Sequence, residues 1–541
     1  MSRTVVKIWT SAGIAAALVV IGAGAAIATE VVLRLKSGDL QISGELVSSD
    51  KTKYTINSRS LGSLTLDAAH FDCISAGCPK EGAAAPAPVP AAHAPEPERA
   101  IGPSQLSISG SNTVGNLLMP ALIDAYAAKT GTKLVKVVST DPLDLDFRMA
   151  GHQEQGASVI ALHRHGSATA FTDLAKQVAQ VGMSSRPIKA DEAQKLIEAR
   201  LGDMRLPGSE HILALDGLVV LVAPDSPVVS LPMQTIVEIF SGQITDWSQL
   251  GLPAGPINVY APTPESGTFD TFDQLVLKAN KVALTPNAKR TANHAEQSDW
   301  VAHDPLGIGF AGIAYQRNSK AVLIQSSCGL TSSPSVFSMK TEDYPLARRL
   351  FLYTSGRPRD PLAQGLLDFA LSQQAQTIVK QSDFIDQIPE LAPYSTQADR
   401  IANSTNAPAE NFDAALMATL TDDLKSRERL SVTFRFQTAS SVLDNKALAD
   451  VKRLVELLKS DDYVKKSILL AGFADSKGLF SVNAELSRSR AKAVLDALRA
   501  NGLSSTQSKI IVKGYGELAP VACNDTQESL QRNRRVEVWV R

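Results

Sequence analysis

The sequence shows almost no excess of charge of either sign. It has 54 Lys and Arg residues against 55 Asp and Glu residues, which gives a formal net charge of -1 at pH 7. A chain that binds nucleic acid through its overall electrostatic field needs a basic surplus. We therefore expect no nucleic acid partner, and any preference for an anion must come from a local arrangement of residues.

Signatures of an enzyme are also missing. Neither Ser111 nor Ser266 lies in a G-x-S-x-G elbow, and no base that would activate either hydroxyl can be identified. The sequence contains no internal repeat. We expect a protein that is not an enzyme and that uses no cofactor.

An apolar run lies near the N-terminus. It covers residues 8–28 without a charge and follows Arg3 and Lys7. Its last three residues have the A-x-A form of a signal-peptide cleavage site, although the run is also long enough to remain as a membrane anchor. Residues 1–28 are thus expected to be a signal peptide or an anchor, and both direct the rest of the chain out of the cytoplasm.

Cysteine is rare, with only four residues in the chain. An exported chain permits disulfides, and no further Cys or His near Cys73 and Cys78 completes a metal site. We expect these two residues to form a disulfide, with two free thiols or a metal pair as the alternatives. The sequence leaves open whether Cys328 and Cys523 pair, stay buried or react.

The chain is too long for a single hydrophobic core, so several folded units are expected in its 541 residues. Alternating apolar stretches predict a small β module at residues 29–80, and the Ala- and Pro-rich residues 81–103 predict a linker. Residues 104–393 alternate short strands with amphipathic helices, as an α/β fold does. A polar linker, 394–424, and a final α/β unit, 425–541, complete a multidomain α/β architecture.

Three segments of the large domain share one design, in which a strand end leads through a Gly- and Ser-rich turn into a helix. They are residues 106–114, 165–169 and 265–268, and residues 184–187 close another strand. Such a turn offers unpaired backbone N-H groups, the positive end of a helix dipole and a hydroxyl donor. One turn is typical of ordinary helix capping, but several in one domain predict a convergent site for a small oxyanion.

Six motifs of this domain follow one another in a specific order. They are SGSNTV at 109–114, VGMSSRPI at 181–188, DGLVV at 216–220, IFSGQITDW at 239–247, ESGT at 265–268 and GIGF at 307–310. In this order they resemble the phosphate-binding members of the periplasmic solute-binding superfamily (PstS-like proteins), which deliver phosphate to an ABC importer. The resemblance implies two α/β lobes joined by crossing strands, with the ligand in the cleft between them. It also implies that the anion is bound by Ser111, Asn112, Thr113, Ser167, Gln180, Ser266, Gly267 and Thr268.

Two positions depart from the family pattern. The family commonly has an Asp at the position of Gln180, which accepts the proton of hydrogen phosphate, and an Arg clamp at the position of Pro262. Each lost charge-assisted hydrogen bond would be worth roughly 1.5 to 3 kcal/mol. Because an amide both donates and accepts, Gln180 would not reject sulfate as a carboxylate would. Phosphate and other oxyanions therefore stay open.

His163 and His165 flank Arg164 before the second turn. Two His residues at i and i+2 on a strand share a face and could ligate a metal, but no completing Cys or acidic pair is found, so no metal site is expected. Arg164 could instead supply the positive charge that Pro262 lacks. A third interpretation is that all three residues face solvent.

In the last unit, Asp475 follows a strand and Arg490 lies on the next helix, where they could flank one pocket. By itself such a pair is typical of a structural ion pair or of solvated charges. The surrounding motifs are GFADSKG at 472–478, Asn483, LSRSRA at 486–491, GYGE at 514–517 and NRRVE at 533–537.

Together these motifs resemble the OmpA-like peptidoglycan-binding domain, an α/β sandwich. In that family the residues matching Asp475 and Arg490 hold the charged ends of diaminopimelate. The resemblance implies that peptidoglycan is bound by Asp475, Asn483, Arg490 and Arg534. Ala474 stands where the family often has Thr, so one hydroxyl contact is lost.

These features predict an envelope protein of a Gram-negative bacterium, in the periplasm or at the outer membrane. We expect it to bind phosphate or a related oxyanion and to anchor non-covalently to peptidoglycan, with an ABC importer or a sensor protein as a partner. The alternative is a structural wall tether whose cleft has lost phosphate affinity or serves a sensor. Gln180 and Pro262 favour the alternative.

Overall fold

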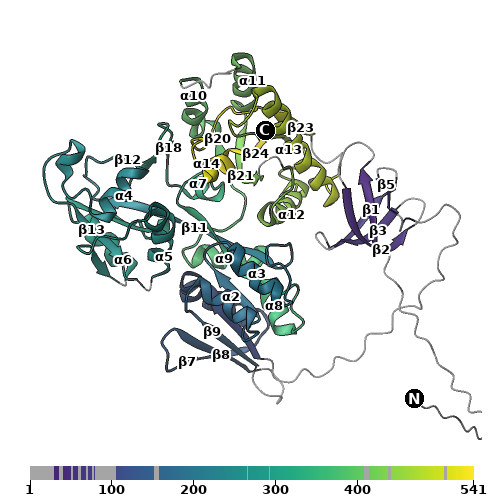
Figure 1. Cartoon of the computed structure of the whole chain (residues 1–541), viewed down its shortest axis with the longest axis horizontal. Coiled ribbons are helices and arrows are strands. Elements are labelled where there is room, and N and C mark those ends of the chain that lie inside the picture. The colour runs from purple at the N-terminus through teal and green to yellow at the C-terminus, as the bar shows by residue number, and fades with distance from the viewer. Residues whose placement is uncertain are drawn as a thin grey trace, which may run out of the picture. The chain divides into compact units, whose positions relative to one another are not determined.

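The computed structural model describes residues 30–35, 41–49, 53–58, 62–68, 71–75, 78, 105–150, 158–264, 266–291, 293–406, 413–436, 440–504 and 509–541. The expected signal peptide or anchor and the linker at 81–103 lie outside the described residues. The chain divides into two units, Met1–Glu96 and Pro97–Arg541, which are described separately (Figure 1). Among the described residues, no helix is long and apolar enough to span a membrane.

The first unit contains an antiparallel sheet with the strand order β4-β3-β2-β1-β5. Its strands are β1 (Glu30–Leu35), β2 (Gln41–Ser49), β3 (Lys53–Ser58), β4 (Gly62–Asp67) and β5 (Phe71–Cys73). Val31, Leu33 and Ile56 are its fully buried core residues. A disulfide joins Cys73 to Cys78 with a Cα–Cα distance of 5.6 Å. Because so small a core gives little stability, the cross-link contributes to holding the module together.

The second unit begins with a two-lobed α/β fold, as expected. The first lobe has the strand order β10-β6-β9-β8-β7, in which β10 and β9 run parallel to β6 and the β7-β8 hairpin is antiparallel. Its elements are β6 (Gln105–Gly110), α1 (Met119–Lys129), β7 (Lys133–Val138), β8 (Asp144–Ala150), β9 (Ser158–His163), α2 (Ser167–Ala175), β10 (Val181–Ser184), α3 (Ala190–Glu198), α8 (Pro361–Ala370) and α9 (Gln373–Gln381). Figure 1 shows α2, α3, α8 and α9 grouped with this sheet.

The second lobe is built around β15, β13 and β14, which are parallel neighbours. Phe240, Phe272 and Phe310 pack in its core, and the rings of Phe272 and Phe310 stack at 3.8 Å between centroids. The elements of this lobe are β12 (Ser230–Pro232), α4 (Met233–Ser241), β13 (Asn258–Pro262), α5 (Gly267–Phe272), β14 (Lys289–Thr291), α6 (His294–Ala302), β15 (Gly307–Gly312), β16 (Lys320–Ala321), β17 (Leu323–Gln325), β18 (Thr331–Ser332) and α7 (Val336–Lys340).

Two crossing strands join the lobes. The first half of β11 (Glu210–Val222) pairs with β19 (Ala347–Tyr353), which also pairs with β10 of the first lobe. The second half of β11 pairs with β15 of the second lobe. A strand that runs through the middle of a sheet is buried on both faces and needs an almost continuous apolar sequence. Asp216 is a charged exception in β11, and it is buried.

The C-terminal domain is a sheet with the order β20-β21-β24-β22-β23. One face packs on α12 and α13 through Val451, Leu454, Val494 and Leu498, all fully buried. The elements are β20 (Leu391–Pro393), α10 (Ala398–Asn406), α11 (Ala414–Leu424), β21 (Glu428–Arg435), α12 (Asn445–Lys459), β22 (Ser467–Phe473), α13 (Phe480–Ala500), β23 (Lys509–Gly514), α14 (Gln527–Asn533) and β24 (Arg535–Val540). This is the α/β sandwich that the sequence predicted.

The stretch 394–424, which we expected to be a linker, contains the helices α10 and α11. Ile401, Met417 and Leu420 are buried against the second face of the sheet, in a cluster that includes Tyr515 and Trp539. These helices are mostly polar and have only a narrow apolar stripe, so their sequence does not indicate a buried face. The stripe is buried only by packing on the folded sheet. This part of the expected linker is therefore part of the C-terminal fold.

The two-lobed fold and the C-terminal domain are also joined directly. The last three residues of the stretch expected as the large domain form β20, which joins the C-terminal sheet beside β21, with Leu391 opposite Leu430. Asp343, which follows α7, forms ion pairs with Arg429 at 2.7 Å and Arg435 at 3.0 Å. The two Arg side chains are almost fully buried and Asp343 is 14% exposed, so the contact is largely desolvated and is not a surface ion pair.

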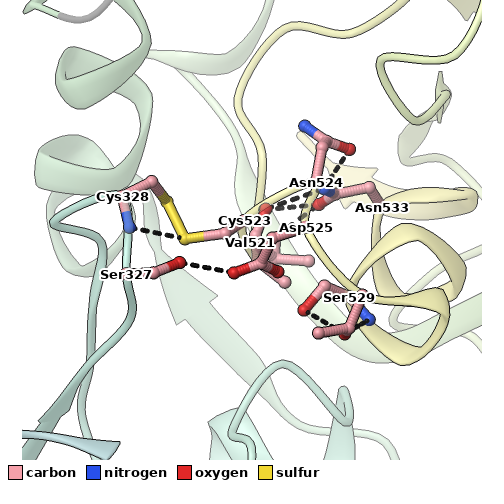
Figure 2. Close-up of a disulfide and its surroundings, with 10 residues drawn as sticks. Ser327, Cys328, Val521, Cys523, Asn524, Asp525, Ser529 and Asn533 are labelled. Atoms are coloured by element: carbon pink, nitrogen blue, oxygen red, sulfur yellow. Dashed lines mark hydrogen bonds between the residues drawn. A yellow bond between two sulfur atoms is a disulfide. The ribbon is translucent and has the colours of Figure 1, made fainter. Parts of the chain in front are cut away.

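A second disulfide crosses the same interface. Cys328 follows β17 in the second lobe, and Cys523 precedes α14, 195 residues away. Figure 2 shows the bridge beside the hydroxyl of Ser327, which donates to the carboxylate of Asp525. The backbone N-H of Cys328 also donates to Sγ of Cys523 at 3.0 Å. The positions of these cysteines in the sequence gave no hint of their pairing.

Candidate functional site

A cavity of about 310 Å³ opens between the two lobes. Its walls combine hydroxyls, backbone, two cations and one carboxylate from both lobes. The lining residues are Asn112, Thr113, Gly166, Ser167, Ala168, Arg186, Lys189, Pro264, Ser266, Gly267, Asp270 and Gln274. This mixture suits a small polar anion that needs several donors.

Each expected strand-to-helix turn reaches this cavity. Gly110 has a φ of 137°, and a Cβ at this position would lie 2.0 Å from the carbonyl oxygen of Met183, so only glycine fits before Thr113. Gly166, with a φ of 98°, leads into Ser167 at the start of α2. Ser266 caps α5, because its Oγ accepts from the backbone N-H of Thr268 at 3.2 Å. The local sequence thus positions three helix starts toward one space.

Five of the eight expected anion-binding residues line the cavity. They are Asn112, Thr113, Ser167, Ser266 and Gly267. The other three, Ser111, Gln180 and Thr268, are not among the lining residues. Ser111 is buried, with its Oγ 3.4 Å from the backbone N-H of Val114, and Gln180 is exposed, with its Oε1 accepting from the backbone N-H of Ser107 at 2.7 Å.

The structure also places Pro262, which stands where the family has an Arg, and Arg164, which was proposed to supply the missing charge. The carbonyl of Pro262 accepts from Nη1 of Arg290 at 2.9 Å. Arg164 donates to the carbonyls of Leu143 and Pro142 at 2.9 and 2.5 Å and to Asn116, and it does not line the cavity. Its guanidinium therefore serves the neighbouring loop.

The cations that do line the cavity are Arg186 and Lys189. Arg186 lies within the Ser-Ser-Arg-Pro motif and holds Glu192 in a bidentate pair at 2.8 and 2.6 Å. This pairing fixes the guanidinium at the cavity wall while its charge is partly balanced. Lys189 precedes α3, and no sequence pattern singled it out.

Arg348, on the crossing strand β19, is a residue that the sequence analysis missed. Its guanidinium donates to Asp216 at 2.9 and 3.1 Å, to Oγ1 of Thr113 at 3.2 Å and to the carbonyl of Gly267 at 3.2 Å. Burial lowers the pKa of Arg348, and the neighbouring Asp216 opposes that shift. A signal existed, because two Arg residues inside an apolar strand are unusual, but its partners lie on other elements.

Arg348 contacts both lobes at the point where they meet. A Cβ on Gly267 would lie 1.9 Å from Oγ1 of Thr113, so the two lobes touch through a position that only glycine can occupy. Thr113 belongs to the first lobe and Gly267 to the second. The Asp216–Arg348 ion pair therefore joins the two lobes through Thr113 and Gly267, and neither of its members is among the residues that line the cavity.

In the C-terminal domain the structure brings together all four expected wall-binding residues. Oδ2 of Asp475 accepts from Arg534 at 2.7 Å, and its Oδ1 accepts from the backbone N-H of Lys477 at 2.9 Å. Nδ2 of Asn483 donates to the carbonyl of Asp475 at 3.1 Å and to Glu517 at 2.7 Å. Glu517 lies in a matched motif but was not assigned, and burial raises its pKa.

Arg490 completes this cluster from α13. Its side chain is fully buried, Nε donates to the carbonyl of Ser440 at 3.1 Å, and the guanidinium lies 5.5 Å from the ring centroid of Phe436. Burial and the nearby Arg534 lower the pKa of Arg490 to about 10, against the opposing effect of Asp475. The cluster therefore presents two guanidinium groups beside two carboxylates, which can recognise a zwitterion.

Comparison with known proteins identifies the families of both domains. A model of the PBP superfamily domain matches residues 95–374, and a model of the OmpA family matches residues 435–534. Protein SphX of Synechococcus elongatus is 32% identical over 186 residues, which are 32% of this chain and 53% of that protein. The phosphate-binding protein PstS of Pseudomonas aeruginosa is 28% identical over 243 residues, 42% of this chain and 73% of that protein.

Among solved structures, an ABC-type phosphate transport receptor from Vibrio cholerae aligns with 52% of this chain and 99% of its own, at 23% identity and a TM-score of 0.40. The chain spans about half the length of SphX. The family assignment rests on the match to residues 95–374, which is more than half of the sequence. The chain belongs to the PBP superfamily and carries a C-terminal domain of the OmpA family.

Proposed function

We propose that the protein binds phosphate or a closely related oxyanion in the cavity between the lobes and holds peptidoglycan through the cluster around Asp475. The observation that carries the first half is the convergence of Asn112, Thr113, Ser167 and Ser266 from both lobes on one cavity. Hydroxyl and backbone donors at helix starts bind tetrahedral oxyanions without a metal. Relatives of the two-lobed domain are named as phosphate-binding proteins, which supports the same class of ligand.

Asp270 gives a reason to favour hydrogen phosphate over sulfate. Its carboxylate lines the cavity, where Nε2 of Gln274 donates to it at 2.9 Å. A carboxylate accepts the proton of hydrogen phosphate but repels a fully ionised sulfate. In this proposal Asp270 performs the discrimination that the family gives to the position of Gln180.

Calorimetry with phosphate, arsenate and sulfate tests the anion. We expect heat of binding with phosphate and arsenate and weaker or no heat with sulfate. Asp270→Asn should narrow the difference between phosphate and sulfate, because an amide no longer repels the sulfate. Equal affinities for phosphate and sulfate in the parent protein would contradict the assigned role of Asp270.

The wall-binding half rests on the four clustered residues and on the OmpA-family match. Diaminopimelate carries a carboxylate and an ammonium group, and the cluster offers Arg490 and Arg534 for the first and Asp475 and Glu517 for the second. The protein would then be fixed to the wall in the periplasm of a Gram-negative bacterium. An ABC importer would receive the ligand from the two-lobed domain, or a sensor protein would respond to the domain when the ligand is bound.

One observation favours a second candidate, a structural wall tether without a ligand. The ion pair between Arg348 and Asp216 already joins the lobes by protein contacts alone. If phosphate, arsenate and sulfate all give no heat while the protein still pellets with wall sacculi, this second function replaces the first.

A further inference from the structure

A polar cluster outside the cavity lies at the ends of β8 and β9. His163 Nδ1 is 3.0 Å and His165 Nε2 is 2.8 Å from the same oxygen, Oδ1 of Asp144. The ligand atoms of these three residues all lie within 4.8 Å of one another. Oδ2 of Asp141 is 3.8 Å from Nε2 of His165. Two imidazoles and a carboxylate thus converge on one point.

The strand register explains the convergence. Asp144 lies directly opposite His163 in the antiparallel pair of β8 and β9. Residues opposite each other in such a pair point to the same face. His165 lies two positions after His163, just beyond the end of β9, and its Nε2 also reaches Oδ1 of Asp144. The sheet therefore supplies the acidic residue that the local sequence around the histidines lacks.

The loop that carries the carboxylates is held in place. The backbone N-H of Leu143 donates to Oδ1 of Asp141 at 2.8 Å, and that of Asp144 donates to the carbonyl of Asp141 at 3.0 Å. Nε of Arg164 donates to the carbonyl of Leu143 at 2.9 Å. Because these contacts order the loop in advance, a ligand would lose little free energy in organising it.

We propose that Asp144, His163 and His165 bind a divalent ion of the Zn²⁺ class, with Asp141 or water as the fourth ligand. Imidazole and carboxylate are ligands that Zn²⁺ prefers, and three protein ligands with one open position form a known type of zinc site. Ligand atoms about 2.0 to 2.2 Å from a tetrahedral ion lie roughly 3.3 to 3.6 Å apart. The separations of Oδ1 of Asp144 from His163 and His165, 3.0 and 2.8 Å, would need to widen only slightly, and these side chains are 24% to 35% exposed to solvent.

The site is independent of the proposed anion function, although it is adjacent to it. His165 immediately precedes Gly166 and Ser167, which line the cavity. The competing interpretation is a pair of ordinary hydrogen bonds, in which one carboxylate oxygen accepts from two imidazoles. A Zn²⁺ titration distinguishes the two interpretations, because only a metal site binds Zn²⁺ saturably.

The test is calorimetric titration of the full chain, prepared without a polyhistidine tag, with ZnCl₂. We expect one Zn²⁺ per chain and an affinity at least about 10-fold lower in Asp144→Asn, His163→Gln and His165→Gln, since even ligand-supporting residues change affinity by that factor. His303→Gln is the matched control, because His303 is exposed on the second lobe and the described hydrogen bond of its imidazole is to the carbonyl of Asp299. It should bind Zn²⁺ like the parent.

Co²⁺ absorption spectra and thermal unfolding distinguish the loss of a metal ligand from a folding defect. Co²⁺ should give visible absorption bands in the parent and in His303→Gln, and none in Asp144→Asn, whose amide keeps the shape of the carboxylate. Thermal unfolding with a chelator present should show that Asp144→Asn folds like the parent. Binding of Zn²⁺ by the variants as strong as in the parent, or no saturable binding in the parent, would overturn the proposal.

Discussion

Arg348 and Arg349 are neighbours in β19, and their side chains serve opposite sides of the crossing strand. Arg348 pairs with Asp216 at 2.9 Å and reaches Thr113 at the cavity. Arg349 pairs with Glu342 and, at 2.8 Å, with Asp444 of the C-terminal domain. Successive side chains on a strand alternate in direction, so this one strand contacts the cleft between the lobes on one side and the C-terminal domain on the other. The two-lobed fold and the C-terminal domain therefore share a connection through β19.

Thr113→Phe should abolish binding of phosphate. Thr113 touches Gly267 across the cleft, so a larger side chain occupies the space of the ligand and separates the lobes. Calorimetry should show no heat, while circular dichroism stays like that of the parent. Thr172→Phe, at an exposed position of α2 in the same lobe, is the control and should bind normally. Undiminished affinity in Thr113→Phe would remove the cavity as the site.

Asp475→Ala or Arg490→Ala should release the protein from isolated peptidoglycan. Truncating one partner of a buried charged contact typically costs about 2 to 5 kcal/mol, enough to lose most of a micromolar interaction. Co-sedimentation with purified sacculi measures the effect. Arg488→Ala is a matched control on the same helix, because its side chain is 65% exposed, and this variant should still pellet. If both site variants pellet like the parent, the wall is bound by other residues.

Replacing both Cys328 and Cys523 by Ser should lower the free energy of unfolding by about 2 to 5 kcal/mol. The bridge closes a long loop, 195 residues in sequence separation, and a long loop loses the most entropy on cross-linking. Denaturant unfolding of the double variant measures the loss. The bridge between Cys73 and Cys78 closes a separation of only 5 residues. Replacing both of these residues by Ser should therefore leave the main unfolding transition in place. An unchanged midpoint in the first variant would mean that the interface holds without its disulfide.

Stability should fall between pH 7 and pH 5 because of His211. Burial lowers the pKa of His211 to about 4, although Asp368 opposes the shift. The unfolded chain has the ordinary value near 6.5, so it binds the proton more tightly, and the stabilisation present above pH 6.5 is lost as the pH falls toward 4. The expected loss by pH 5 is about 2 kcal/mol.

Denaturant unfolding at both pH values measures this slope. His211→Gln should reduce it, since glutamine keeps a polar contact with Thr354 without titrating. His303→Gln should leave the slope unchanged. The buried carboxylates Glu342 and Asp343, whose pKa values several Arg residues hold well below the usual range, contribute only at lower pH. A slope that is equal in the parent and in His211→Gln would assign the effect to other groups.

The sequence by itself determined the features that depend on local spacing. Thr113, Ser167 and Ser266 each lie between the end of a strand and the start of a helix. Every turn of this kind leaves the first backbone N-H groups of the helix without a partner inside the helix. The motif around Asp475 likewise identified its domain. Arg490 reaches it from α13, and Arg534 from the junction between α14 and β24. The alternation of strands and helices predicted the α/β class, and the resemblance that the motifs carry implied the two lobes and the α/β sandwich.

The tertiary structure alone decided which distant residues meet. Arg348 reaches Thr113 because β19 crosses between the lobes, and Asp144 joins His163 because β8 pairs with β9 in one register. Cys328 and Cys523 pair across an interface that also buries Asp343. These contacts depend on strand pairing and on domain packing, which sum many weak interactions over the whole chain, so no local spacing encodes them.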